Sequence, residues 1–293
     1  MPEVSNILVI GAAGRFAGLV VPALARRGVK PRGFVRTPDQ AGTARANGAE
    51  EVVLGDLRDE ASVTAALRGV ERAFYISPVY QDDEAEMGIG FVKAARRAGV
   101  KRIVFSTIIH PSLALRNHAS KRPIENALFE SGLDHVLLRP AVLYQNLVAA
   151  WPGIIESGVL AEPFSSTARI ARVDYRDVAE VAALALTEDL LLNGTFELSA
   201  DSGMTREEVA AIASRVSGRT ITPAAPDFEA WVAKAKLPYN ADQKRQLAAM
   251  YANYDQHGLL GNPFTLRAIL GRAPRSMDMF FADLMSGAPI TIA

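Results

Sequence analysis

Short apolar runs alternate with longer, alanine-rich stretches along the first half of this chain. The intervening stretches, such as 84–100 (EAEMGIGFVKAARRAGV), repeat apolar residues at helical spacing and end in basic residues followed by Gly. Regular alternation of strands and helices predicts a parallel sheet covered by helices on both faces. The predicted strands are 6–10 (NILVI), 31–35 (PRGFV), 51–55 (EVVLG), 72–77 (RAFYIS), 102–107 (RIVFST) and 135–140 (HVLLRP).

The pattern changes after residue 140. Residues 141–165 are rich in aromatic and small side chains, and a further strand and helix follow before a last strand at 194–200. From Thr205 onward the pattern predicts helices only, and Thr205 with Glu208 forms the T-x-x-E pattern of a capping box. We therefore predict an α/β protein, with a Rossmann doubly wound parallel sheet and a smaller, mostly helical C-terminal lobe. The predicted domains are 1–150, completed by 168–200, and a substrate-binding lobe made of 151–167 and 201–293.

Composition narrows the class of partner. Hydrophobic residues make up 49% of the 293 residues, and 32 basic residues balance 32 acidic ones, so bulk charge favours neither nucleic acid nor a membrane surface. No apolar run approaches the roughly 18 residues that span a bilayer. The chain has no cysteine, and its four histidines form no H-E-x-x-H pattern, so we expect no metal site. No leader pattern precedes the first strand; we expect a cytoplasmic protein that binds a small molecule.

A glycine-rich turn, 11–18 (GAAGRFAG), lies between the first predicted strand and helix. In such a turn the first glycine, Gly11, makes the tight bend, and Gly14 lets the backbone approach a pyrophosphate. Ala17 supplies the small third residue that lets the helix pack on the sheet. An ordinary βα turn has a similar composition, but a position directly after the first strand favours a dinucleotide site at the helix N-terminus.

The end of the second strand indicates which dinucleotide is bound. A protein that prefers NAD usually places a carboxylate there for the ribose 2'-hydroxyl, whereas this chain has Arg36 and Thr37, with Asp39 lying beyond Pro38. Arg36 and Arg15 are suited to a 2'-phosphate through charge-assisted hydrogen bonds. The alternative is that both are solvated surface arginines. We expect NADP(H) rather than NAD(H).

The ends of the third and fourth strands add further candidates. Asp56 is placed to accept from the adenine amino group, although a helix-capping role for Asp56 or Asp59 fits the sequence as well. Ser77 and Pro78 end the fourth strand, where ligands of open parallel sheets bind.

Several stretches together resemble the NmrA-like branch of the atypical short-chain dehydrogenase/reductases. The resemblance covers nearly the whole chain and implies a Rossmann domain that binds NADP(H), with a C-terminal lobe closing a substrate cleft. Members include quinone and dye reductases, relatives of isoflavone reductases, and redox sensors that bind a dinucleotide without turnover. The stretches are GAAGRFAG, FVRTPD, VVLGDLRD, RIVFST, KRPIENALFESGLDHVLLRPAVLYQN, ARVDYRDVAEVAA and LGRAPRSMDMFF.

The resemblance also locates the expected catalytic residues. Ordinary short-chain dehydrogenases use Ser, Tyr and Lys, with the Tyr four residues before the Lys as proton donor. Lys121 matches the lysine, but Asn117 occupies the tyrosine position, and Thr107 lies where the serine belongs. His118, three residues before Lys121, either replaces the missing acid or is an ordinary surface histidine. Glu125 is expected to pair with Lys121 or with Arg122.

These observations lead to two functional hypotheses. The first is an NADPH-dependent reductase that transfers hydride to a quinone or similar conjugated or aromatic electrophile; the alternative is a non-catalytic NADP-binding redox sensor that acts through a protein partner. A homodimer is compatible with either. The expected catalytic residues are Lys121 and His118. The expected cofactor-binding residues are Gly11, Ala13, Gly14, Arg15, Phe16, Arg36, Thr37, Asp56, Leu57, Ser77, Pro78, Thr107 and Lys121, and the expected substrate-binding residues are Tyr80, Ile109, His110, Leu143, Tyr144, Asn146, Trp151 and Phe164.

Overall fold

The chain divides into two compact units, and the computed structural model describes residues 6–288 and residue 290. Within these, the first unit holds 6–140 and 175–197, and the second holds 141–174 and 198–290 apart from residue 289. Each unit has its own cluster of buried apolar side chains, as a compact folding unit requires.

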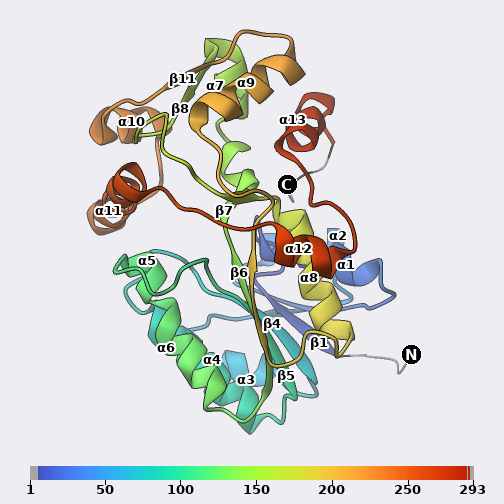
Figure 1. Ribbon diagram of the computed structural model, residues 1–293. Coiled ribbons are helices and arrows are strands. Elements are labelled where there is room, and N and C mark those ends of the chain that lie inside the picture. Colours follow the sequence, from blue (N-terminus) through green and yellow to red (C-terminus); the bar gives the residue numbers. More distant parts are fainter. Residues whose placement is uncertain (1–5, 289, 291–293) are drawn as a thin grey trace. The chain divides into compact units, whose positions relative to one another are not determined.

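A seven-stranded sheet forms the centre of the first unit. The six strands other than the last in sequence pair in parallel, and Leu8 lies beside Arg32 on one side and Ala73 on the other. This confirms the predicted doubly wound α/β fold, whose strand order reverses at the point where such sheets bind ligands. In order across the sheet the strands are β10 (Gly194–Leu198), β6 (Asp134–Pro140), β5 (Arg102–Ser106), β4 (Arg72–Ile76), β1 (Ile7–Ile10), β2 (Arg32–Val35) and β3 (Glu51–Leu54) (Figure 1).

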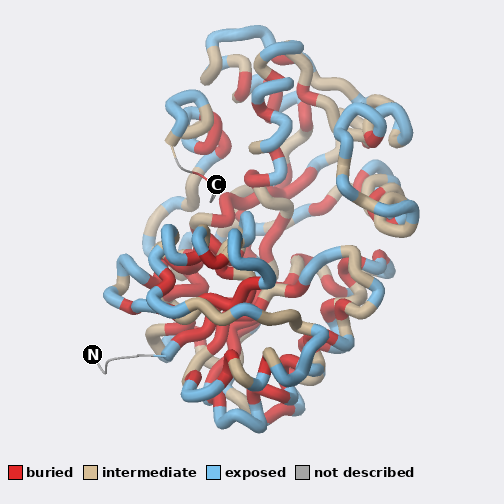
Figure 2. The backbone as a smooth tube through the Cα atoms, turned by 180° about the vertical axis from the view of Figure 1, so that it is seen from behind, coloured by how far each residue is buried: buried red, intermediate tan, exposed pale blue. Residues whose placement is uncertain are grey.

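Helices cover both faces of this sheet (Figure 1). One face carries α3 (Glu60–Ala66), α4 (Glu84–Arg97) and α6 (Lys121–Phe129), and the short α5 (Arg116–Ala119) precedes α6. The other face carries α1 (Val20–Ala25), α2 (Pro38–Ala46) and α8 (Tyr175–Thr187). Figure 2 shows that buried residues run along the strands, whereas the helices alternate between buried and exposed positions. Strands β1 and β5 are buried along their whole length, as a sheet with two covered faces requires, whereas β3 at the edge of the sheet is partly exposed.

The second unit combines two small parallel strand pairs with helices. Strand β7 (Val142–Leu143) pairs with β9 (Arg172–Val173), and β8 (Val159–Ala161) pairs with β11 (Thr222–Ala224). The prediction of helices only after Thr205 is therefore wrong at β11, a short edge strand that tolerates Pro223. The capping box at Thr205 is confirmed. The helices are α7 (Trp151–Ser157), α9 (Arg206–Ser217), α10 (Phe228–Ala235), α11 (Ala241–His257), α12 (Phe264–Leu270) and α13 (Met277–Ser286).

The core of the second unit is rich in aromatic side chains. Trp151 stacks on Phe281 with ring centroids 4.8 Å apart, and Tyr144 packs against Phe280 at 5.3 Å. All four are buried, so Tyr144 and Trp151 serve the core of this unit. Among the helices of the described chain, none has the length and apolar character needed to cross a membrane.

Candidate functional site

The glycine turn has the conformation that the sequence predicts. Gly11 has a φ of +71°, a region that favours glycine, and its amide donates to the carbonyl of Phe34 in β2 at 2.9 Å. The amide of Gly14 donates to the Gly11 carbonyl at 2.7 Å, and a Cβ on Gly14 would lie only 3.0 Å from that oxygen. Ala17 is buried and begins the 3-10 turn Ala17–Leu19 that leads into α1. Gly14 and Arg15 are exposed, so this backbone bend is open to a ligand.

Two exposed arginines lie within this turn and at the end of β2. The Arg15 guanidinium lies 5.9 Å from the centre of the Phe16 ring, which itself packs 5.2 Å from Tyr175. Arg36 follows β2 directly. In the part of the chain that the structure describes, neither guanidinium pairs with a carboxylate. Thr37, also expected at the cofactor, caps α2 by accepting from the Gln40 amide at 3.3 Å.

The structure distinguishes the two aspartates after β3. Asp59 caps α3 by accepting from the Ala61 amide at 3.0 Å. Asp56 accepts from the Arg58 amide at 2.9 Å and keeps its side chain 44% exposed. The capping role therefore belongs to Asp59, and the role predicted for Asp56 at adenine stays a prediction. Leu57 is half-buried beside Asp56.

Lys121 is buried and paired with a carboxylate that its sequence motif does not predict. Its ammonium forms an ion pair with Glu84, and the Ser120 hydroxyl donates to the other Glu84 carboxylate oxygen at 3.0 Å. Lys121 is 5% exposed and Glu84 1%. Burial lowers the pKa of the Lys121 ammonium. The Glu84 carboxylate opposes that effect, because an opposite charge favours the protonated amine.

A close helix contact brings this pair together. Gly88 lies one turn after Glu84 in α4, and Ile124 lies one turn after Lys121 in α6. A Cβ on Gly88 would approach Ile124 Cγ1 to 2.6 Å, so the two helices can pack this closely only because residue 88 has no side chain. Lys121 also opens its helix, where the macrodipole disfavours a cation. A buried cation at a helix N-terminus needs a carboxylate partner. This requirement alone could have predicted that Lys121 pairs with a residue such as Glu84.

The end of β5 holds a second polar network. The Thr107 hydroxyl donates to Glu125 at 2.8 Å, and Arg139 donates two hydrogen bonds to the same carboxylate at 2.6 and 3.2 Å. The expected pairing of Glu125 with Lys121 or its neighbour is therefore wrong, since Arg139 takes that place. The adjacent Ser106 accepts from the buried Tyr175 hydroxyl at 2.9 Å, and burial raises the pKa of that phenol.

The two histidines near the end of β5 differ in exposure. His118 is completely buried, so its interpretation as a surface histidine is wrong. Its Nδ1 lies 3.1 Å from the His110 carbonyl oxygen and donates to it, and burial lowers the pKa of His118, which favours the neutral ring. His110 has a φ of +50°, an uncommon value for a residue with a side chain. Its imidazole is 35% exposed, and Nε2 lies 3.9 Å from the Glu197 carboxylate in β10.

The residues expected at the substrate divide between the two units. In the first unit, Ile109 is buried with its amide donating to the Pro140 carbonyl at 3.0 Å, and Tyr80 is half-buried with a φ of +60°. In the second unit, Asn146 is exposed, and Leu143 is half-buried in β7. The remaining predicted cofactor neighbours, Ser77 and Pro78, follow β4, the first buried and the second exposed.

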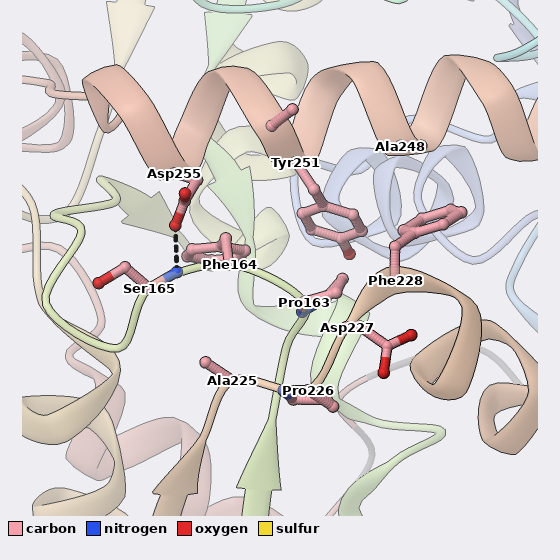
Figure 3. Close-up of a pocket in the computed structure, with 11 residues that line it drawn as sticks. Pro163, Phe164, Ser165, Ala225, Pro226, Asp227, Phe228, Ala248, Tyr251 and Asp255 are labelled. Atoms are coloured by element: carbon pink, nitrogen blue, oxygen red, sulfur yellow. Dashed lines mark hydrogen bonds between the residues drawn. The ribbon is translucent and has the colours of Figure 1, made fainter.

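Phe164 lines a pocket of about 600 Å³ in the second unit (Figure 3). Tyr144 and Trp151, expected beside it, are not among the residues that line this pocket. Within the described residues no group of three or more His, Cys, Asp or Glu side chains is arranged to hold a metal ion.

Comparison with known proteins identifies relatives along the length of the chain. An NAD(P)H azoreductase of Xenophilus azovorans is 28% identical over 277 residues, covering 94% of this chain and 96% of the relative. Quinone oxidoreductase 2 of Escherichia coli (strain K12) is 29% identical over 275 residues, covering 90% and 93%. The crystal structure of an NADPH-dependent quinone oxidoreductase of E. coli in complex with NADPH has a TM-score of 0.82 at 26% identity, covering 95% and 99%.

The family assignment agrees with these relatives. The model of the NmrA-like family matches residues 3–280, which include the glycine turn, Lys121 and most of the second unit. The resemblance stated from the sequence motifs is thus confirmed. This chain belongs to the NmrA-like family.

Proposed function

We propose that this protein is an NADPH-dependent reductase that transfers hydride to a quinone or a similar conjugated or aromatic electrophile. The observation that carries the proposal is full-length similarity to two reductases, the azoreductase and quinone oxidoreductase 2. The NADPH complex of the E. coli enzyme supports the same cofactor. The chemistry of the cofactor is hydride donation, and the chain has to bind it, orient it and position the acceptor.

The glycine turn and the two arginines fit NADP(H). Gly14 leaves its backbone open for a pyrophosphate, and the adjacent helix N-terminus favours an anion. Arg15 and Arg36 are exposed cations without carboxylate partners among the described residues, so a 2'-phosphate can engage both without breaking an ion pair. We propose that Ala13, Phe16, Thr37, Asp56, Leu57, Ser77, Pro78 and Thr107 complete the cofactor contacts.

Lys121 is proposed to orient the nicotinamide ribose, with Glu84 holding the ammonium in place. The residue at the usual tyrosine position is Asn117, which is buried and cannot deliver a proton. A quinone or an azo dye does not require a strong acid from the protein, because its delocalised product takes a proton from water. Correct positioning alone can lower such a barrier by roughly 7 to 11 kcal/mol.

The structure favours a supporting role for His118 over a role as proton donor. A neutral ring whose Nδ1–H is used on a carbonyl has no second proton to give, and its lowered pKa disfavours the imidazolium. We propose that His118 instead holds the His110 loop, and that the partly exposed imidazole of His110 faces the acceptor. The homodimer, the absence of nucleic acid as a partner and the cytoplasmic location stay predictions.

The test follows NADPH absorbance with the purified protein and a panel of quinones, azo dyes and conjugated enones. The double variant Glu84→Gln/Lys121→Met removes the amine without leaving a buried carboxylate alone, and we expect it to reduce kcat at least tenfold. Lys93→Ala, on the exposed face of α4, is the matched control and should match the wild type. If no acceptor is reduced while NADP(H) binds tightly, the reductase proposal is wrong and the redox-sensor alternative is favoured.

A further inference from the structure

The pocket in the second unit lies between two chain segments and one helix (Figure 3). Residues 163–165 and 225–228 form two of its sides. The third side is α11, which contributes Ala248, Tyr251, Ala252 and Asp255 at the i, i+3, i+4, i+7 spacing of one helical face. The two alanines leave room beside Tyr251, and the volume of about 600 Å³ is in the range of small-molecule sites.

A buried arginine fixes the two segments that border this pocket. Arg206 donates from Nη1 to the carbonyls of Phe164 at 2.8 Å and Ala224 at 3.0 Å, and it forms an ion pair with Glu162. Its guanidinium also lies 4.3 Å from the centre of the Phe164 ring. Arg206 is 1% exposed, so these contacts are shielded from water. The pocket is therefore supported by a buried anchor, which makes it preorganised for a ligand.

Aromatic rings in the pocket and beside it pack on one another in defined geometries. Phe164 and Tyr251 are stacked, with centroids 5.5 Å apart and planes inclined by 21°. Phe228 lies 6.5 Å from Tyr251, and Trp231 meets Tyr251 edge-on at 5.4 Å. The Trp231 indole donates to the Ala161 carbonyl at 3.1 Å, which fixes its orientation. Of the rings that line the pocket, Tyr251 and Phe228 are half-buried and offer flat apolar surfaces that suit a planar aromatic ligand, whereas Phe164 is buried behind them.

The charged side chains that line the pocket are both acidic. Asp227 accepts from the Ala230 amide at 2.9 Å as the cap of α10, and Asp255 accepts from the Ser165 amide. No Lys or Arg lines the pocket. Figure 3 shows Asp255 beside Ser165 and Asp227 on the opposite side of Tyr251. Two carboxylates beside aromatic faces attract a cation and repel an anion.

We propose that this pocket binds a planar aromatic cation. The aromatic faces of Tyr251 and Phe228 contact its rings, and Asp227 and Asp255 complement its charge. Small side chains on α11 admit the ligand, so a larger residue at Ala248 blocks it. This proposal concerns binding alone and does not depend on hydride transfer.

The experiment compares three probes of equal ring size by isothermal titration calorimetry: N-methylacridinium, neutral acridine and acridine-9-carboxylate. We expect the cation to bind at least tenfold more tightly than the carboxylate, with acridine between them. A Trp151→Phe background leaves Trp231 as the single tryptophan, since the chain has two, and the bound cation should quench its fluorescence. Equal affinity for the three probes, or binding without quenching, would overturn the proposal.

Variants locate the binding. Asp227→Asn keeps a good helix cap. This substitution and Asp255→Asn should each weaken binding of the cation by about two- to fivefold and leave the affinity for acridine unchanged. Glu229→Gln, an exposed residue of α10 outside the pocket, is the charge-matched control and should have no effect. Ala248→Phe should abolish binding of all probes while thermal melting shows an intact fold. If Ala248→Phe binds the cation as the wild type does, the ligand occupies another surface and the proposal is wrong.

Discussion

Replacing Glu84 by Gln tests whether the buried ion pair holds Lys121. The substitution keeps the shape of the side chain and an acceptor for Ser120, but it leaves the Lys121 ammonium without a counter-charge. Removing one partner of a buried pair typically costs about 3 to 5 kcal/mol. Lys121 limits that cost by losing its proton. Release at pH 7 from the ordinary pKa of 10.5 costs about 4.8 kcal/mol, which is of similar size.

The stability of the wild type should depend on pH in a direction that follows from the lowered pKa of Lys121. Between the folded-state pKa and 10.5 the unfolded chain binds the proton that the folded protein has lost, so stability rises with pH in this window. Glu84→Gln shares this rise, because burial lowers the pKa of Lys121 in both proteins, so the deficit of the variant should be about the same at pH 9.5 as at pH 7. Adding Lys121→Met should restore most of the loss at both pH values, because a neutral packed pair is tolerated.

The assay is urea unfolding followed by far-ultraviolet circular dichroism at pH 7 and pH 9.5. Glu86→Gln, an exposed position on α4, is the control and should stay within about 0.5 kcal/mol of the wild type. The reasoning is refuted by a Glu84→Gln variant as stable as the wild type at pH 7. It is also refuted by a wild type whose stability does not rise between pH 7 and pH 9.5.

Three further outcomes are expected. Gly88→Ala should lower the free energy of unfolding in urea by about 1 to 3 kcal/mol, because the added methyl group meets Ile124. Gly90→Ala, which has open space around it, should not destabilise the protein. Equal effects of the two substitutions would contradict the close helix contact. Burial raises the pKa of Asp201 to about 6, so the unfolded chain loses its proton first and stability should fall by about 2 kcal/mol as pH rises from 4 to 6. Asp201→Asn should flatten that decline in urea melts, and an unchanged profile would assign it to other groups. Arg36→Ala should weaken NADPH binding about tenfold in calorimetry and leave the affinity for NADH unchanged. An equal loss of affinity for both dinucleotides would argue against a 2'-phosphate contact.

Local sequence patterns were sufficient to predict much of the first unit. The alternating apolar runs predicted the strands and the parallel sheet, and the glycine spacing predicted the turn at Gly11. The capping box at Thr205 was predicted from two residues three positions apart. Each of these features depends on neighbours within a few residues, so the chain itself contains the needed information. The short strand at 222–224 was missed because its partner lies about sixty residues earlier.

The partners of the polar side chains depended on contacts far apart in the chain. Lys121 was identified from its motif, but its pairing with Glu84 requires α4 and α6 to approach at Gly88, 36 positions before Ile124. The partner of Glu125 was also mispredicted, because helical spacing favoured the nearby Lys121 or Arg122 over Arg139.

The sequence by itself determined the strand and helix pattern, the phosphate-type turn and the family, because these depend on periodicity and on short motifs. Only the tertiary structure decided which charges are neutralised, which histidine is exposed and where an aromatic pocket opens. Burial and pairing set the charge of Lys121 and of His118, and burial and pairing depend on packing between elements distant in the chain.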